Sequence, residues 1–194
     1  MSTEQKTIIR EQILRTRSLL NNDEREGKEL RIFKRFIDLD VISKYHTFMV
    51  YSSFGSEINT WPIIDYLYQF THRIVFPKVD PTSKELKLYL VKNKELLTPG
   101  IWNILEPDEI RCEPIMLGDI DFILIPGLAF GRDGYRIGYG GGYYDKLLAQ
   151  SSCRAYKAAI SFDFQLINEI PKENYDQPIN ALITEVQVYY FQDN

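Results

Sequence analysis

Glycine is concentrated in one short part of this chain, and that concentration restricts the fold more than any other feature of the sequence. Seven of the eleven glycines lie between Gly127 and Gly142. They follow residues 120–125, an apolar run with the length and composition of a buried strand. Residues 143–148 then repeat apolar side chains at helical spacing, so a helix is predicted to begin near Gly142. The expected order is a strand, a loop largely free of side chains, and a helix.

Residues 136–145 are the candidate anion site of this segment. A glycine loop before a helix presents backbone N–H groups and the positive end of the helix dipole to one point, where phosphates bind. Glycine runs also form turns without a ligand, and neither a Walker ending nor a dinucleotide fingerprint near the chain start is present. Two residues beside the glycines favour the binding of phosphate. Arg136 can pair with phosphate oxygens, and Asp145 can hold magnesium or simply stabilise the first helical turn.

Strands and helices alternate along the rest of the chain. Apolar periodicity predicts two helices in the first forty residues, with a break and an N-cap at Asn22 and Asp23. A third helix is predicted after Thr60, which would cap it, with Pro62 in its first turn. Strands are predicted at residues 47–51, 73–76 (ended by Pro77), 86–90, 120–125, 158–161, 180–184 and 186–191. This alternation predicts an α/β fold, a mainly parallel sheet flanked by helices, with ligands beyond the carboxyl ends of its strands.

The composition limits the class of protein. A chain of 194 residues that is 44% hydrophobic is expected to form one domain, residues 1–194. The net charge of −4 argues against a nucleic-acid partner. Cys112 and Cys153 have no zinc-motif spacing and suggest reduced thiols in the cytoplasm. The polar N-terminus resembles neither a signal peptide nor a membrane span, so we expect a cytoplasmic protein without membrane partners. No heptad pattern suggests an interface, so a monomer is expected.

The motif Arg-Ile-Gly-Tyr-Gly-Gly-Gly-Tyr-Tyr-Asp at residues 136–145, preceded by Pro126 and Gly127, resembles the signature of the 5-formyltetrahydrofolate cyclo-ligases, also called 5,10-methenyltetrahydrofolate synthetases. Further landmarks of that family match at Lys6 and Arg10 and at residues 56–60, 76–78, 101–107 and 171–176. The resemblance spans almost the whole chain. It implies a three-layer Rossmann-like fold and a reaction in which ATP and magnesium convert 5-formyltetrahydrofolate to 5,10-methenyltetrahydrofolate, with release of ADP and phosphate.

The resemblance also implies roles for individual residues. Expected ATP ligands are Lys6, Arg10, Arg136, Ile137, Gly138, Tyr139, Gly140, Gly141, Gly142, Tyr143 and Tyr144. Expected folate contacts are Glu57, whose carboxylate suits the N–H-rich edge of a pterin, with Ser52, Phe54, Trp102, Tyr143 and Tyr144. The magnesium ion is expected at Asp145 and Asp176.

Taken alone, the same residues have plainer interpretations. Lys6 and Arg10 stand four residues apart and are typical of a solvated helix face. Glu57 is typical of an exposed loop, and Asp176 of a residue that caps a turn. The aromatic residues of the set often serve in a core. Lys78, just past a predicted strand, would add positive charge near the site.

The implied chemistry needs no covalent nucleophile on the protein. The formyl group on N5 is an amide and a poor electrophile, and phosphorylation of its oxygen would give an iminium phosphate that N10 attacks before phosphate leaves. The enzyme has to hold the γ-phosphoryl group in line with the formyl oxygen and neutralise developing charge.

One departure and two competing functions stay open at the level of the sequence. Some relatives carry basic residues in the glycine loop where this chain has Tyr139 and Gly141, which places extra weight on Arg136, magnesium, and the Lys6 and Arg10 pair. A sugar-phosphate isomerase or CoA-transferase-like enzyme has the same architecture, but it leaves residues 136–145 without a role. A non-catalytic Gly/Tyr-rich binding module is opposed by the acidic net charge.

Overall fold

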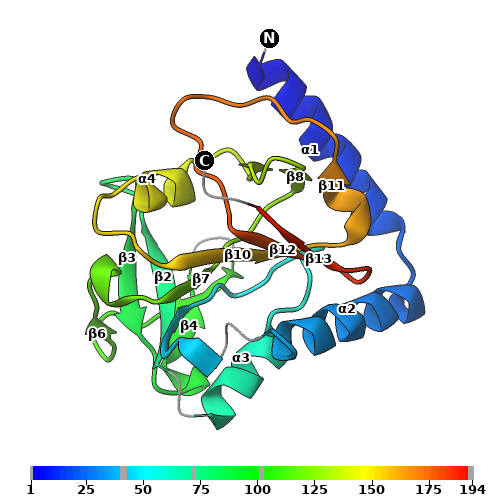
Figure 1. The fold of residues 1–194 in the computed structure, drawn as a ribbon. Coiled ribbons are helices and arrows are strands. Elements are labelled where there is room, and N and C mark those ends of the chain that lie inside the picture. The colour runs from blue at the N-terminus through cyan, green and yellow to red at the C-terminus, as the bar shows by residue number, and fades with distance from the viewer. Residues whose placement is uncertain (1, 40–42, 71–72, 101–102, 192–194) are drawn as a thin grey trace.

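An eight-stranded sheet forms the centre of the molecule (Figure 1). The structure, a computed structural model, describes residues 2–39, 43–70, 73–100 and 103–191. In spatial order the strands are β13 (Val188–Tyr190), β12 (Ala181–Ile183), β10 (Tyr156–Ile160), β7 (Phe122–Leu124), β1 (Thr47–Met49), β2 (Arg73–Asp80), β3 (Glu85–Leu90) and β6 (Glu113–Pro114). The strands from β12 to β2 run parallel, whereas β13, β3 and β6 pair antiparallel. The predicted α/β class with a mainly parallel sheet is confirmed.

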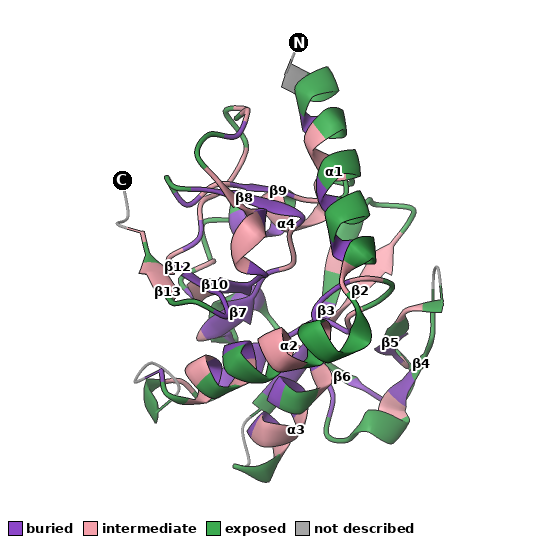
Figure 2. Cartoon of the chain, turned by 90° about the vertical axis from the view of Figure 1, so that its right-hand side faces the viewer, coloured by how far each residue is buried: buried purple, intermediate pink, exposed green. Residues whose placement is uncertain are grey.

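Helices and small sheets surround this centre. The helices are α1 (Ser2–Leu19), α2 (Asn22–Ile37), α3 (Trp61–Gln69) and α4 (Tyr143–Leu148). A three-stranded sheet contains β11 (Leu166–Ile167), β8 (Ala129–Gly131) and β9 (Arg136–Ile137), and β4 (Leu97–Pro99) pairs with β5 (Leu105–Pro107). Helix α1 lies against β8 and so stands beside the small sheet, away from the large one (Figure 2).

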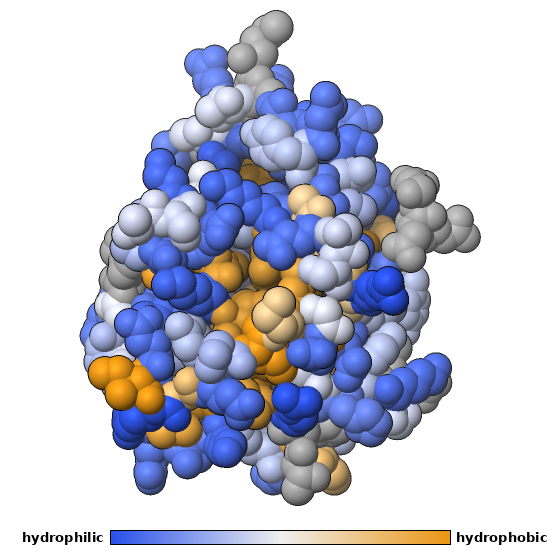
Figure 3. All heavy atoms as spheres, turned by 90° about the vertical axis from the view of Figure 1, so that its left-hand side faces the viewer, coloured by the Kyte–Doolittle hydropathy of each residue, from blue (hydrophilic) through white to orange (hydrophobic). Residues whose placement is uncertain are grey.

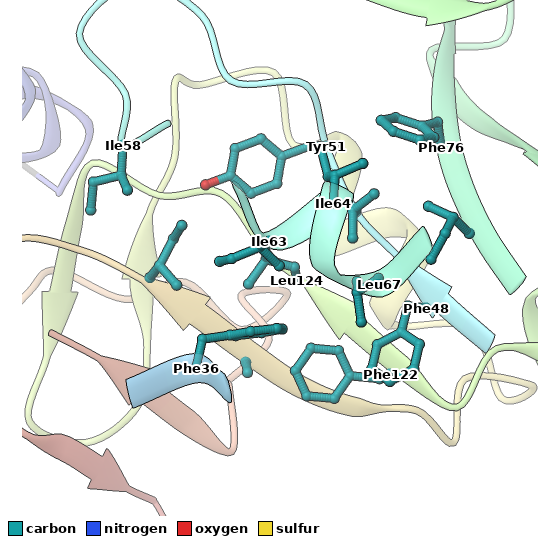
Figure 4. Close-up of a cluster of buried hydrophobic side chains, with 14 of the residues drawn as sticks. Phe36, Phe48, Tyr51, Ile58, Ile63, Ile64, Leu67, Phe76, Phe122 and Leu124 are labelled. Atoms are coloured by element: carbon teal, nitrogen blue, oxygen red, sulfur yellow. The ribbon is translucent and has the colours of Figure 1, made fainter. Parts of the chain in front are cut away.

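Both faces of the large sheet are apolar. Successive residues of its strands point alternately to the two faces, and each face packs into its own core. Phe48 belongs to the core beneath α2 and α3, and the next residue, Met49, belongs to the core beneath α4. Figure 4 shows the first core, where Phe36 of α2 and Leu67 of α3 lie beside Phe48 and Phe122 of the sheet. Burial of each such side chain stabilises the fold by about 1.5–3 kcal/mol.

The second face is covered less completely. Helix α4 has six residues, packs on β3, and is too short to cover β6 as well. Apolar side chains therefore reach the surface on the side of the molecule that carries β3, β6 and α4 (Figure 3). They line a groove of about 280 Å³ formed by Leu86, Leu88, Ile115, Met116, Leu117 and Leu147, among others.

Two helix starts differ in detail from the sequence prediction. Helix α2 is capped by Asn21, whose side chain accepts a hydrogen bond from the Glu24 N–H, one position before the predicted cap. Thr60 does precede α3, but its hydroxyl donates to the Tyr51 carbonyl (2.8 Å) and does not cap the helix. Thr60 thereby joins the end of the loop after β1 to its beginning.

Strand β2 differs from its predicted bounds. It does not end at Pro77 but continues to Asp80, pairing with β3 along this extension. Strand β1 pairs with β2 only as far as Val75, so the missing N–H of Pro77 interrupts no ladder on that side. The residues that follow Phe76, predicted to leave the sheet at Pro77, are therefore part of the hairpin of β2 and β3.

The glycine-rich segment is also more structured than predicted. Strands β8 and β9 form a hairpin between β7 and α4, and the loop that enters α4 is confined to residues 138–142. Gly127 and Gly134 serve the hairpin. A methyl group at Gly127 would lie 2.5 Å from the Phe130 ring, and Gly134 has φ 84°. The helix predicted to begin near Gly142 does begin there.

None of the helices in the described part of the chain has the length and apolar character that a membrane crossing requires.

Candidate active site

Helix α1 is fixed to two distant segments by its basic side chains. Lys6 Nζ lies 2.7 Å from Asp176 Oδ2, and both side chains are close to fully buried. Arg10 Nε donates to the Gly138 carbonyl at 2.8 Å. The predicted common face of Lys6 and Arg10 therefore points inward, and it joins the helix to the glycine loop and to the segment around Asp176.

Arg136 is a buried cation beneath the glycine loop. Its Nη2 lies 3.1 Å from Asp145 Oδ1, and its Nη1 donates to the Gln177 carbonyl at 2.9 Å. Burial lowers the pKa of Arg136, and the negative charge of Asp145 opposes that effect. Gln177 in turn donates its N–H to Asp145 Oδ1 at 3.2 Å. Arg136 thus holds Asp145 next to Gln177, the residue that follows Asp176.

Asp145 and Asp176, the two predicted metal ligands, each use one oxygen for their contacts. Asp145 receives Arg136 and Gln177 on Oδ1, and Asp176 receives Lys6 and the Glu173 N–H on Oδ2. Among the described residues, the second oxygen of each carboxylate has no hydrogen bond, and no third acidic, histidine or cysteine ligand joins them. Two carboxylate oxygens suit a magnesium ion that keeps waters and binds phosphates, but not a closed cage of protein ligands.

Two glycines of the loop at residues 138–142 have left-handed backbone conformations. Gly140 has φ 106° and Gly142 has φ 69°, values that residues with a side chain rarely adopt. Gly138 differs, because its φ is not in the left-handed region and no atom lies within 4 Å of a methyl group placed there. Gly138 is therefore not required as glycine by the fold of the ligand-free protein.

Glu57 is a buried carboxylate on the loop after β1. It is 7% exposed, and its Oε2 accepts the Phe54 N–H at 3.1 Å. Burial raises the pKa of Glu57, and Arg17 opposes the shift. Burial, followed by the charge of Glu57, raises the pKa of Tyr144 well above its usual range and that of Tyr139 to about 12. The predicted folate loop and the glycine segment therefore do meet at Glu57.

The other predicted folate residues differ in position. Ser52 is buried and donates to the Leu105 carbonyl at 2.8 Å, which joins its loop to β5. Phe54 lies at the surface with its ring 5.2 Å from that of Tyr139. Trp102 lies outside the described residues. Tyr143 packs against the loop, since its ring would lie 2.6 Å from a methyl group at Gly141.

Lys78 forms an ion pair with a residue that does not belong to this group. Its Nζ is 3.6 Å from Glu109, in a half-exposed ion pair. A cavity of about 430 Å³ adjoins Glu57 and Phe54, but its other lining residues come from the start of α2 and from residues 53–61, none from the glycine loop. It lies on the α2 side of the Glu57 loop.

Sequence reasoning missed Arg17, which is 3% exposed and faces Ser56 and Tyr139. The signal was present. Arg17 stands seven residues, or two helical turns, after Arg10, so it shares the face of Lys6 and Arg10. Arg25 of α2 was also missed. It donates to the carbonyls of Ser56 and Glu57 and thereby supports the backbone of the folate loop.

Comparison with known proteins gives one consistent result. The model of the 5-formyltetrahydrofolate cyclo-ligase family matches residues 2–185. The cyclo-ligase of Escherichia coli K12 is 30% identical over 146 residues, covering 74% of this chain and 80% of the relative. The mouse enzyme is 27% identical over 175 residues, covering 86% of each chain.

Solved structures agree with these relatives. The NMR structure of 5,10-methenyltetrahydrofolate synthetase from Aquifex aeolicus has 30% identity and a TM-score of 0.85, covering 97% of this chain and 94% of its own. A synthetase from Mycoplasma pneumoniae has a TM-score of 0.75 at 24% identity, a likeness that concerns the fold alone.

Proposed function

The chain belongs to the 5-formyltetrahydrofolate cyclo-ligase family, a family of ligases, and we propose that it converts 5-formyltetrahydrofolate to 5,10-methenyltetrahydrofolate with ATP as phosphoryl donor. The observation that carries the proposal is the meeting of the Glu57 loop with the glycine segment, through the Phe54 ring beside Tyr139 and through Arg17, which donates to both Ser56 and Tyr139. A folate-binding carboxylate and a phosphate-binding loop at one place are what phosphoryl transfer to a folate requires. Neither the isomerase nor the binding-module interpretation accounts for this pairing.

The proposed reaction has two steps. The formyl oxygen attacks the γ-phosphorus of ATP, the bond from that phosphorus to the β-bridging oxygen breaks, and ADP leaves. The resulting N5 iminium phosphate is attacked at its carbon by N10, which loses its proton to solvent. The carbon–oxygen bond then breaks, and phosphate leaves with the former formyl oxygen. The protein contributes orientation and electrostatic stabilisation, not a covalent intermediate.

Residues on three segments are proposed to hold ATP. The N–H groups of residues 138–142 surround the phosphates, with the glycines allowing close approach. Arg10 fixes this loop through the Gly138 carbonyl, and its guanidinium lies 3.7 Å from a methyl group placed at Gly140, so its remaining donors border the loop. Lys6 and Arg136 act on the site through their ion pairs. Lys6 adds positive charge beside Asp176, and Arg136 holds Asp145 in place.

Asp145 and Asp176 are proposed to hold the magnesium ion that accompanies ATP. Each would use the carboxylate oxygen that has no hydrogen bond to the described residues. The ion would neutralise charge on the β- and γ-phosphates. Lys6 and Arg136 orient the two carboxylates, so that the protein holds both before any ligand arrives.

Glu57 is proposed to accept two N–H groups from the pterin. Its raised pKa reflects the cost of an ionised carboxylate in a buried place, and a pterin that donates to both oxygens would offset that cost. Phe54, Tyr143 and Tyr144 would line the ring. The folate site then adjoins the phosphate loop, as transfer to the formyl oxygen demands.

The proposal is tested by mixing the protein with 5-formyltetrahydrofolate, ATP and magnesium, and following the near-ultraviolet absorbance of the methenyl product. We expect an increase that needs all three additions and that falls by at least about a hundredfold in Asp145→Asn. Asp133→Asn is the matched control, because Asp133 lies on the same segment in an exposed pair with Lys172. Folded protein that forms no product would refute the proposed function.

A second prediction concerns the phosphate loop. Gly138→Ala should change the free energy of unfolding by less than about 0.5 kcal/mol, since the ligand-free loop has room for the methyl group. If phosphates lie against the loop, the same methyl group should raise the Kd of ATP by about tenfold, which corresponds to about 1.4 kcal/mol.

Gly140→Ala is the counterpart. Because Gly140 has φ 106°, alanine there should cost both stability and ATP affinity. Calorimetry measures the Kd of ATP, and urea unfolding measures the free energy of unfolding. Gly138→Ala should change only the first quantity, whereas Gly140→Ala should change both. Unchanged ATP affinity in Gly138→Ala would mean that this loop does not touch the phosphates.

A further inference from the structure

Arg17 is a buried cation to which the proposed ATP and folate contacts give no role. It is 3% exposed and lies on α1. Its Nε and Nη2 donate to Ser56 Oγ at 3.0 and 2.8 Å, and Nη2 also donates to the Tyr139 hydroxyl at 3.0 Å. Among the described residues its hydrogen bonds all go to hydroxyl oxygens. Burial of a guanidinium without an ion-pair partner lowers the stability of the fold, so a role for Arg17 in ligand binding would explain why it is there.

The direction of the hydrogen bonds around Tyr139 follows from the donor rules. A guanidinium can only donate, so the Tyr139 oxygen accepts from Arg17. The phenol keeps its own proton, and burial together with the nearby charge of Glu57 raises the pKa of Tyr139 to about 12. Arg17 therefore donates to both Ser56 and Tyr139, and these three residues form one relay between two loops.

The relay joins the two proposed binding sites. Tyr139 belongs to the loop proposed to bind phosphates, whereas Glu57 and Ser56 belong to the loop proposed to bind the pterin. Arg17 holds both loops from one side, and Arg10, two turns earlier on the same helix, holds the neighbouring Gly138 carbonyl. The Tyr139 ring is 43% exposed and lies 5.2 Å from that of Phe54, so the aromatic contact closes the outer side of the relay.

We infer that Arg17 and Tyr139 are positioning residues that join the loop of Ser56 and Glu57 to the glycine loop and so couple folate binding to the order of the nucleotide loop. The inference rests on the proposed function. A pterin on Glu57 fixes the loop that carries Ser56, and Arg17 and the Tyr139 hydroxyl bonded to it are fixed as well. The backbone of the glycine loop then has less freedom to lose when ATP arrives, so each ligand tightens the binding of the other.

The variant that isolates this role is Tyr139→Phe. It keeps the ring on Phe54 and removes only the hydroxyl that accepts a hydrogen bond from Arg17. Tyr135→Phe is the matched control, because Tyr135 lies on the same hairpin, with its ring under Lys172, outside the proposed site. Both variants lose one oxygen atom and nothing else.

The coupling is measured by calorimetry as the ratio of the Kd of a non-hydrolysable ATP analogue without and with saturating 5-formyltetrahydrofolate, in the presence of magnesium. In the unaltered protein we expect a ratio of at least about five, at the low end of allosteric coupling factors. Tyr139→Phe should bring the ratio close to one, because the hydrogen bond from the charged Arg17 that reaches the glycine loop is lost. Tyr135→Phe should retain the original ratio.

A second variant separates positioning from simple packing. Arg17→Lys keeps a buried cation but cannot reach Ser56 and Tyr139 together, so its coupling ratio should fall as in Tyr139→Phe. Arg15→Lys, an exposed position on the same helix, should not change the ratio. The double variant Arg17→Lys/Tyr139→Phe should be no weaker in coupling than either single one, because both remove the same relay.

The outcomes distinguish this inference from the proposed function. If the unaltered protein turns over 5-formyltetrahydrofolate but its coupling ratio is one, or if Tyr139→Phe keeps the original ratio, the inference is wrong and the proposed function stands. If the unaltered protein neither binds nor converts 5-formyltetrahydrofolate, both fail. Equal loss of coupling in Tyr135→Phe would also overturn the inference, since the effect would then not depend on the relay.

Discussion

Replacement of Arg136 by methionine is expected to lower kcat/KM by about a thousandfold. Arg136 is buried and bridges the Asp145 carboxylate and the Gln177 carbonyl. Methionine fills much of the same space but donates no hydrogen bond. Asp145 would then lose its cation, and the oxygen proposed to face magnesium would lose its fixed direction.

The same change should also destabilise the fold. Removal of one partner of a buried ion pair typically costs about 3–5 kcal/mol, because the remaining charge is left uncompensated. Asp145 is about one-fifth exposed and keeps the Gln177 N–H, so the lower end of that range is expected. Urea unfolding measures this cost apart from activity, and rates should be compared under conditions in which the variant is fully folded.

Two further variants make the Arg136 experiment specific. Arg132→Met alters an exposed arginine of the same hairpin that bonds only to Asn168 among the described residues, and it should leave both rate and stability unchanged. Arg136→Lys keeps the charge but cannot contact Asp145 and the Gln177 carbonyl at once, so it should recover only a small part of the activity. A folded Arg136→Met that retains a rate within tenfold of the unaltered protein would contradict the proposed role of Asp145.

The local part of the site could be predicted from the sequence, and the long-range part could not. Periodicity alone placed the start of α4 at Gly142 and put Lys6 and Arg10 on one helix face. The partner of Lys6 is Asp176, 170 residues away, and no spacing rule connects the two. The family resemblance named both residues as ligands without indicating that they pair.

Short strands account for most of the error in the fold. Strands β8 and β9 have three and two residues, too few for alternation to be visible, so the segment that contains them was predicted as one loop. Pro77 was read as a strand end because proline breaks ladders, but its strand has a partner on only one side at that point. Arg17 was overlooked for a different reason, since basic residues on a helix are ordinarily solvated.

Replacement of Glu57 by glutamine should have opposite effects on folate binding and on stability. Hydrogen bonds to a charged group contribute about 1.5–3 kcal/mol, so loss of the carboxylate should weaken folate binding by about ten- to a hundredfold. An amide presents one acceptor and one donor, and its donor would face an N–H of the pterin. Binding of ATP alone should change little, which calorimetry with each ligand separately can establish.

The effect of Glu57→Gln on stability follows from the raised pKa of Glu57. The folded protein binds the proton of this carboxyl more tightly than the unfolded chain does, so the contribution of Glu57 to stability is most favourable below the usual pKa of 4.5 and is lost as pH rises through the folded value. At neutral pH the ionised, buried carboxylate therefore costs stability, and glutamine avoids that cost. The midpoint of thermal unfolding should be higher for Glu57→Gln at neutral pH, and the difference should shrink as the solution is acidified.

Glu11→Gln, at an exposed position of α1, is the control for both effects and should show neither. A Glu57→Gln protein that is less stable at neutral pH would mean that Arg17 and Tyr139 stabilise the carboxylate more than burial destabilises it. A carboxylate that lowers stability in the ligand-free protein and raises affinity for the substrate is what a binding site requires, because the pterin supplies the partners that the fold leaves out. The paired measurement therefore tests whether Glu57 serves the fold or the ligand.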